Sequence, residues 1–161
     1  MNSRQPNPAG TGATTITNLA LAVFRLNGVL LNWGDRLVAP LGLTSARWQM
    51  LGAVALAGVP LTAPQLSEAM GVTRQGAQKQ LNLLLEQGLV DVSPNPGHRR
   101  SPLYALTPQG LALYRKADAI WNAQASQLAA LIPASQASAA ARALESMLQA
   151  LQVANGSVEV E

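Results

Sequence analysis

The sequence predicts a mainly α-helical protein with one small β-hairpin, and three observations lead to this prediction. Alanine and leucine dominate a chain of 161 residues in which 48% of residues are hydrophobic, and both residue types favour helices. Apolar residues recur every three or four positions through most of the chain, which is the period of an amphipathic helix. Only between positions 89 and 106 does the pattern change to the alternation typical of β-strands.

A long amphipathic helix is expected over residues 14–40. It follows a segment at 1–13 that is rich in Asn, Pro, Gly and Thr and that we expect to be a flexible tail. The apolar residues of the helix alternate at spacings of three and four, which places them on one face. The helix should end near Pro40, because proline interrupts the hydrogen-bond ladder. The stripe consists of Ile16, Leu19, Val23, Leu26, Leu30, Trp33 and Leu37.

Three shorter helices are expected in the middle of the chain. Thr44, Thr62 and Thr73 each precede a helical pattern, and threonine is a favourable N-cap residue. Gln65 lies three residues after Thr62, which is the spacing of a capping box. The second and third of these helices are separated only by a short turn that contains Gly71, and glycine can adopt the left-handed backbone that such a turn needs. The pair is therefore a candidate helix-turn-helix.

Two strands are expected directly after these helices, at 89–93 and 103–106. The loop between them, 94–102, contains three prolines and the pair Arg99 and Arg100. We expect the prolines to restrict both strands to the edge of a sheet. A helix-turn-helix followed at once by a hairpin with a basic tip is a winged helix, which we place at residues 41–107.

The C-terminal part, residues 108–155, is expected to form two helices that are interrupted at Pro133, followed by a flexible tail at 156–161. The last helix carries Leu144, Leu148 and Leu151 at spacings of four and three. One winged helix cannot bury the stripes of the first helix and of the last two, so we expect these helices to form a homodimer. The alternative is that they pack within one chain as a small bundle.

Composition excludes several classes of function. Cysteine is absent and histidine occurs once, which excludes disulfides, thiol nucleophiles and zinc sites built from these residues. No carboxylate pair, metal cluster or phosphate-binding loop stands out, so neither an enzyme nor a cofactor is expected. No signal peptide is apparent, and polar residues interrupt the apolar stretches at 19–31 and 48–61. We therefore expect a cytoplasmic protein without a membrane segment.

The polar face of the helix after Thr73 is the main functional signal. Gln75, Gln78 and Lys79 project away from its apolar face. Glutamine can bond an adenine edge, and lysine can reach guanine or a phosphate. Arg74, in the first turn, is placed to hold a phosphate. The alternative is an ordinary helix with a solvated polar face.

The hairpin tip adds a second basic element. Arg99 and Arg100 are placed to enter a minor groove or to bind phosphate, and His98 beside them is expected to face solvent or phosphate rather than to act in catalysis. The alternative is a solvated loop that happens to contain two arginines.

Four segments of the sequence together resemble the MarR family of bacterial transcriptional regulators. The resemblance implies a homodimer with intertwined terminal helices, a recognition helix from Thr73 to Gln87 in the major groove, and a wing from Leu89 to Leu106. Many members repress transcription and release DNA when a small ligand binds. The acidic wing residue of many members is missing at Gly97 and His98. The four segments are TAPQLSEAMGVTRQG (62–76), LLEQGLV (84–90), NPGHRRS (95–101) and LTPQG (106–110).

Four residues near the junction of the first two helices are candidates for a ligand pocket, namely Trp33, Arg36, Arg47 and Trp48. Aromatic walls beside a cation would suit an aromatic carboxylate. The alternative is that the two tryptophans belong to the hydrophobic core.

The sequence thus predicts a dimeric, sequence-specific DNA-binding regulator, a repressor that a small aromatic ligand releases. Its partner would be double-stranded DNA with an imperfect palindrome, because the symmetry of a dimer is mirrored in its site. The alternative is a protein-interaction module on the same fold that has lost DNA binding. The modest net charge of +3 and the altered wing motivate this alternative.

Overall fold

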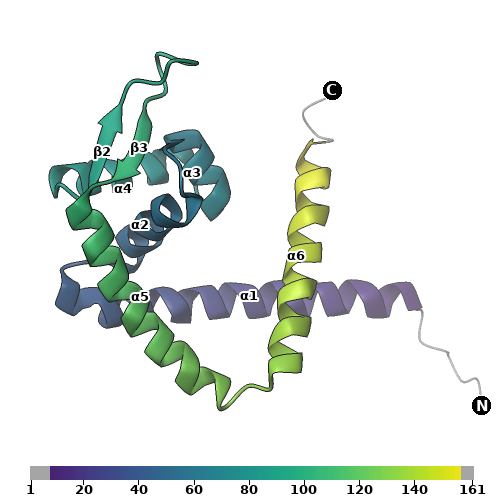
Figure 1. Cartoon of the computed structure of the whole chain (residues 1–161). Coiled ribbons are helices and arrows are strands. Elements are labelled where there is room, and N and C mark those ends of the chain that lie inside the picture. Colours follow the sequence, from purple (N-terminus) through teal and green to yellow (C-terminus); the bar gives the residue numbers. More distant parts are fainter. Residues whose placement is uncertain (1–7, 157–161) are drawn as a thin grey trace, which may run out of the picture. The chain divides into compact units, whose positions relative to one another are not determined.

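The computed structural model describes residues 8–156, and within them it confirms a mainly helical protein with a small antiparallel sheet (Figure 1). The chain divides after Ala117 into two compact units. The first unit contains everything up to the first half of α5, and the second contains the rest of α5 and α6. The elements are α1 (Pro8–Val38), the 3-10 turn η1 (Ala39–Leu41), α2 (Ser45–Ala57), β1 (Leu61–Thr62), α3 (Ala63–Met70), α4 (Arg74–Glu86), β2 (Val90–Ser93), β3 (Leu103–Leu106), α5 (Pro108–Ala129) and α6 (Ala134–Gly156).

Helix α1 begins at Pro8, six residues before the expected start, so the part of the expected tail at 8–13 is helical. Proline is tolerated in a first turn, where its missing N–H would have no intrahelical partner. The Thr15 hydroxyl donates to the carbonyl of Thr11 at 2.9 Å, a bond within the helix. The expected tails at 1–7 and 157–161 lie outside the described residues.

The expected helix caps of the middle segment are confirmed. Thr44, Thr62 and Thr73 each accept, through the side-chain oxygen, a hydrogen bond from the backbone N–H three residues later. The Thr62 N–H donates to the side-chain oxygen of Gln65 at 2.9 Å, which completes the capping box. Gly71 ends α3 with φ +61°, a left-handed conformation that favours glycine. The helix-turn-helix of α3 and α4 is therefore present as predicted.

The hairpin is part of a three-stranded antiparallel sheet with the order β1-β3-β2. The expectation that both hairpin strands lie at an edge is wrong for β3, which pairs with β2 on one side and with β1 on the other. Pro102 precedes the first residue of β3, so its missing N–H removes no bond from the ladder. On the β1 side, Leu61 lies opposite Tyr104.

The core of the first unit lies between α2, α3, α4 and the sheet. Its largest fully buried side chains come from every one of these helices and from β2. Tyr104 of β3 is only 4% exposed and packs against this core. The fully buried large side chains are Val38, Leu51, Leu66, Leu81, Leu84 and Val90.

Helix α1 exposes many large apolar side chains. The segment Thr11–Leu41 is long and apolar enough to cross a membrane by length and composition, with a mean hydropathy of 1.4 over 18 residues and none of that window buried. This differs from the expectation that no apolar stretch suits a bilayer. The same features also describe a helix that a second protein copy covers. The exposed apolar residues are Ile16, Leu21, Phe24, Leu26, Val29 and Leu30.

Candidate nucleic-acid interface

Helix α4 is held by one apolar face, which leaves its opposite face free. Ala77, Leu81 and Leu84 follow one another at spacings of four and three, and all three are 0% exposed. Figure 1 shows α4 beside α3 and the two long strands. The buried contacts fix the rotation of the helix about its own axis, so the residues that face outward are determined by the sequence.

The outer face of α4 is hollowed and polar. An open concavity of about 520 Å³ lies over it. Three residues expected to read bases line this concavity, and three further lining residues were not expected. Asn82 lies four positions after Gln78, Leu83 lies four after Lys79, and Glu86 lies seven after Lys79. Helical spacing could therefore have revealed them, because such positions share a helix face. The concavity is lined by Gln75, Gln78, Lys79, Asn82, Leu83 and Glu86.

Thr73 and Arg74 lie at the start of α4 and are not among the residues that line this concavity. Thr73 is the N-cap of α4, and its hydroxyl oxygen accepts from the Gly76 N–H at 3.0 Å. Arg74 is the first helical residue and is exposed. An exposed arginine at a helix N-terminus adds a full positive charge to the partial positive charge of the backbone N–H groups, which suits a phosphate.

Gln78 is connected to the wing. Its side-chain nitrogen donates to the Asn82 carbonyl oxygen at 2.8 Å and to the Tyr104 hydroxyl at 2.9 Å. Tyr104 belongs to β3, 26 positions away in sequence. A side chain of the proposed recognition helix is thus hydrogen-bonded to the middle strand of the sheet.

The wing tip between β2 and β3 is exposed and basic. His98, Arg99 and Arg100 are all exposed, and Figure 1 shows their loop at the far end of the hairpin. The His98 N–H donates to the Asn95 carbonyl at 3.2 Å, and the Ser101 N–H donates to the His98 carbonyl at 3.0 Å. The structure therefore brings the two arginines together on one turn-stabilised loop.

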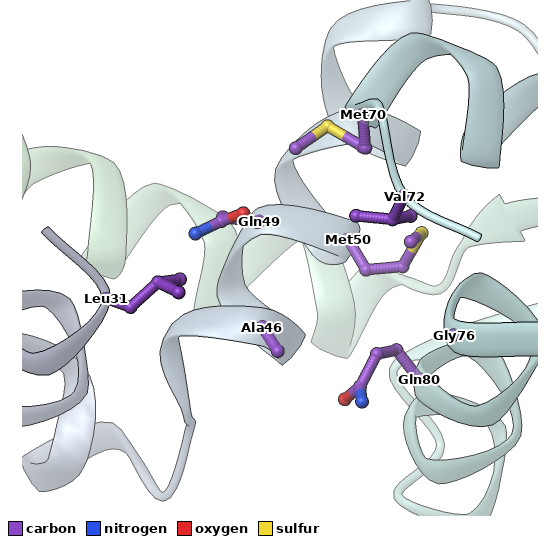
Figure 2. Close-up of a pocket in the computed structure, with 8 residues that line it drawn as sticks. All are labelled: Leu31, Ala46, Gln49, Met50, Met70, Val72, Gly76 and Gln80. Carbon is purple, nitrogen blue, oxygen red and sulfur yellow. The ribbon is translucent and has the colours of Figure 1, made fainter. Parts of the chain in front are cut away.

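A separate cavity of about 240 Å³ lies behind α4, between α1, α2 and the turn after α3 (Figure 2). None of the four expected ligand residues is among the residues that line it. Trp33, Arg47 and Trp48 are half-buried, Arg36 is exposed, and the Arg47 side chain donates to the Thr44 hydroxyl at 3.4 Å. The cavity is lined by Leu31, Ala46, Gln49, Met50, Met70, Val72, Gly76 and Gln80.

The lining of this cavity carries no charged side chain, and its only polar side chains are the amides of Gln49 and Gln80. It uses the face of α2 that contains Ala46 and Met50 instead of the neighbouring face with Arg47. Within the described residues, no group of three His, Cys, Asp or Glu side chains could hold a metal ion.

Comparison with known proteins shows which family this part of the chain resembles. Residues 41–101 match the sequence model of the MarR family. Over these residues the chain is similar to the MarR family. The match covers α2 to the wing tip, including the helix-turn-helix and the two wing arginines, and it confirms the resemblance that the sequence motifs indicated.

A protein of Mycobacterium tuberculosis is 44% identical to this chain over 95 residues, which are 59% of this chain and 65% of the relative. The chain therefore spans 65% of the length of this relative.

Two solved structures share the fold over most of the chain. The first is a mutant MarR from E. coli complexed with operator DNA, with a TM-score of 0.72, 21% identity, and coverage of 83% of this chain and 96% of that one. The second is CouR from Rhodococcus jostii bound to p-coumaroyl-CoA, with a TM-score of 0.71, 22% identity, and coverage of 80% and 90%. At these identities the similarity establishes the MarR-type fold.

Proposed function

We propose that this protein is a dimeric, sequence-specific DNA-binding regulator that acts in the cytoplasm. The observation that supports the proposal most is the pairing of a free polar face on α4 with a basic, hydrogen-bonded wing tip in a MarR-family segment. An α-helix fits the major groove, and a wing beside it can reach the backbone or the adjacent minor groove. The similar fold of a MarR protein solved on operator DNA adds support.

The proposed contacts divide into two kinds. Gln75, Gln78 and Lys79 line the concavity of α4 and would contact base edges in the major groove. Thr73 and Arg74, at the positive end of the helix, would hold a phosphate.

In the wing, His98, Arg99 and Arg100 would contact the DNA backbone or the minor groove. All three side chains are exposed at the hairpin tip. Two full positive charges there would supply a salt-dependent share of the binding free energy.

The dimer is proposed from the apolar faces that a single chain leaves exposed. Helix α1 exposes six large apolar side chains, and Arg25 lies midway along it, a costly residue in the middle of a membrane span. Helix α6 exposes Leu144, Leu148, Leu151 and Val153, which are between 37% and 72% exposed. A second copy of the chain that covers these faces would remove a large apolar surface from water. The resulting symmetry predicts an imperfect palindrome with half-sites about one helical turn apart.

The cavity behind α4 is a proposed effector site, through which a bound ligand would release the repressor from DNA. It touches both α2 and the recognition helix at Gly76 and Gln80, so a molecule in it would bias the position of α4. Apolar walls and two amides favour a small neutral ligand over the aromatic carboxylate expected near Arg36 and Arg47. The ligand-bound structure of similar fold supports an effector of some kind.

Selection of binding sites from a random DNA pool, followed by footprinting, tests the proposal. We expect enrichment of one imperfect palindrome and protection of two half-sites. A pool that stays random would favour the alternative, a protein-interaction module without DNA binding. Protection of a single asymmetric half-site would contradict the dimer.

A further inference from the structure

We propose that Gln78 contacts DNA through its carbonyl oxygen alone, and that it therefore selects a base that offers an amino group, adenine or cytosine. Tyr104 is the positioning residue that imposes this restriction. The inference rests on the proposed DNA-binding function and deepens it, because it assigns a chemical preference to one position of the site.

Both N–H groups of the Gln78 amide are used inside the protein. The nitrogen donates one hydrogen bond to Asn82 at 2.8 Å and one to Tyr104 at 2.9 Å. A glutamine amide has only two N–H donors. Among the hydrogen bonds of the described residues, none uses the Gln78 carbonyl oxygen as an acceptor. The group that remains for a base is therefore an acceptor.

Tyr104 is a rigid anchor for this arrangement. The residue is 4% exposed, and it lies in the middle strand, which pairs with a neighbour on each side. Its hydroxyl therefore cannot follow Gln78 if that side chain turns toward DNA. Releasing the amide would leave a partly buried hydroxyl without its partner, which is unfavourable. Gln78 should thus keep its orientation when DNA binds.

An acceptor-only side chain discriminates among bases in the major groove. Adenine N6 and cytosine N4 are donors there, whereas guanine O6 and thymine O4 are acceptors that would repel the Gln78 oxygen. The two-bond contact that glutamine can make with adenine needs an N–H for adenine N7, and Gln78 has none left. The Gln78 oxygen should therefore bind the amino groups of adenine and cytosine about equally well. Gln78 differs in this respect from Gln75, which lines the same concavity without such hydrogen bonds.

The experiment uses the full-length protein and the site selected from a random pool. Gln78→Ala should lose base preference at one position per half-site, and the wild-type protein should require the amino group of the adenine or cytosine in that base pair. Replacing that base by an analogue without the amino group (purine for adenine, pyrimidin-2-one for cytosine) should weaken wild-type binding roughly tenfold. Where the base is adenine, 7-deazaadenine, which lacks N7, should change binding less than twofold.

Unchanged wild-type binding after removal of the amino group from that base pair would overturn the inference, because Gln78 would then not act as an acceptor. Equal losses from the purine and 7-deazaadenine substitutions would also overturn it, because the contact would be the ordinary two-bond one. In both cases selection of a site would still support DNA binding. A pool without enrichment would refute the proposed function, and this inference with it.

Tyr104→Phe tests the positioning role directly. The variant keeps the ring and frees one N–H of Gln78, so binding should become sensitive to 7-deazaadenine. Arg142→Ala, a control at an exposed residue of α6 outside the proposed DNA interface, should leave the preference at the Gln78 position unchanged. A readout without DNA is the thermal unfolding of Gln78→Ala, Tyr104→Phe and the double variant. The shifts in Tm should be clearly non-additive. Additive shifts would show that Gln78 and Tyr104 are not coupled and would overturn the positioning role of Tyr104.

Discussion

The side chain of Asn95 donates a hydrogen bond to the backbone carbonyl of Ser101 at 3.0 Å, across the base of the wing loop. Its carbonyl oxygen accepts from the Gly97 N–H, also at 3.0 Å. The Asn95 amide therefore holds the loop with both its nitrogen, which donates, and its oxygen, which accepts. The acidic residue that many similar wings contain is missing here, and Asn95 supplies hydrogen bonds that hold the loop that carries Arg99 and Arg100.

Asn95→Ala should loosen the wing tip with little effect on the rest of the fold. Two hydrogen bonds are lost, each with a net contribution of about 1 kcal/mol, and the loop must then be ordered when DNA binds. We expect an affinity loss of about fivefold to tenfold and faster amide exchange at residues 97–101. Asn95→Asp keeps the acceptor and loses the donor, so it should give an intermediate loss. An Asn95→Ala protein with unchanged exchange in this loop would contradict the account.

The wing arginines should act mainly through the DNA backbone. Arg99→Ala and Arg100→Ala should weaken binding to all sequences alike, and each should reduce the slope of log Kd against log salt concentration by about 1. Titrations at several salt concentrations measure this slope. Arg142→Ala, an exposed arginine of α6 outside the proposed interface, should leave the slope unchanged. A change of base preference in Arg100→Ala would instead place this side chain against a base edge.

The cavity behind α4 should distinguish a neutral ligand from an anionic one of the same shape. Benzamide and benzoate are matched probes, since the lining offers two amides and no cation. We expect benzamide to perturb the NMR signals of Met50 and Met70 at millimolar concentration, with a weaker effect from benzoate. Ala46→Phe, which fills the cavity from an exposed position, should abolish the benzamide effect. Stronger binding of benzoate would instead support the prediction of an anionic ligand.

Gly110 shows that one close backbone contact fixes the start of α5. A Cβ atom added at this residue would collide with the carbonyl oxygen of Leu89, and the backbone there cannot move aside as a side chain would. Gly110→Ala should lower the free energy of unfolding by at least about 2 kcal/mol. At Gly52, an added Cβ would lie 3.7 Å from the Tyr114 ring, so Gly52→Ala should gain up to about 1 kcal/mol. Denaturant unfolding of both variants measures the contrast, and equal stabilities would contradict it.

Leu148→Asp tests the proposed dimer. Leu148 is 49% exposed in the single chain, and a partner that covers it would bury an unpaired charge in the variant, which is strongly unfavourable. We expect monomeric or insoluble protein, and weaker DNA binding because two half-sites can no longer be held together. Ser146→Asp, at an exposed polar position of the same helix, should remain a dimer. Sedimentation velocity measures the outcome, and a soluble Leu148→Asp dimer with wild-type affinity would show that this face is not the interface.

Features that depend on neighbouring residues were predictable from the sequence. Thr62 and Gln65 form their capping box from groups three positions apart, and the buried face of α4 follows from the spacing of Leu81 and Leu84. Strand β1 was not predictable, because two residues carry no periodicity and become a strand only by pairing with residues 103–104.

Features that depend on distant residues became visible only in the structure. The hydrogen bond from Gln78 to Tyr104 joins residues that are 26 positions apart in sequence. The sequence around neither residue indicates this bond. The cavity combines α1, α2, α4 and the turn after α3, so an analysis based on the aromatic residues of one helix junction did not name any residue that lines it. The helical start at Pro8 was hidden because proline and glycine usually indicate a loop.

The most direct test of the central claim is a fluorescence anisotropy titration of the full-length protein. The selected palindrome and a scrambled duplex of equal length and composition would be compared at 50 mM and 200 mM salt. We expect the palindrome to bind at least 10³-fold more tightly than the scrambled duplex, with two chains per duplex and weaker binding to both at the higher salt. Equal affinities for the two duplexes, or no binding at 50 mM salt, would contradict the assignment as a sequence-specific DNA-binding regulator.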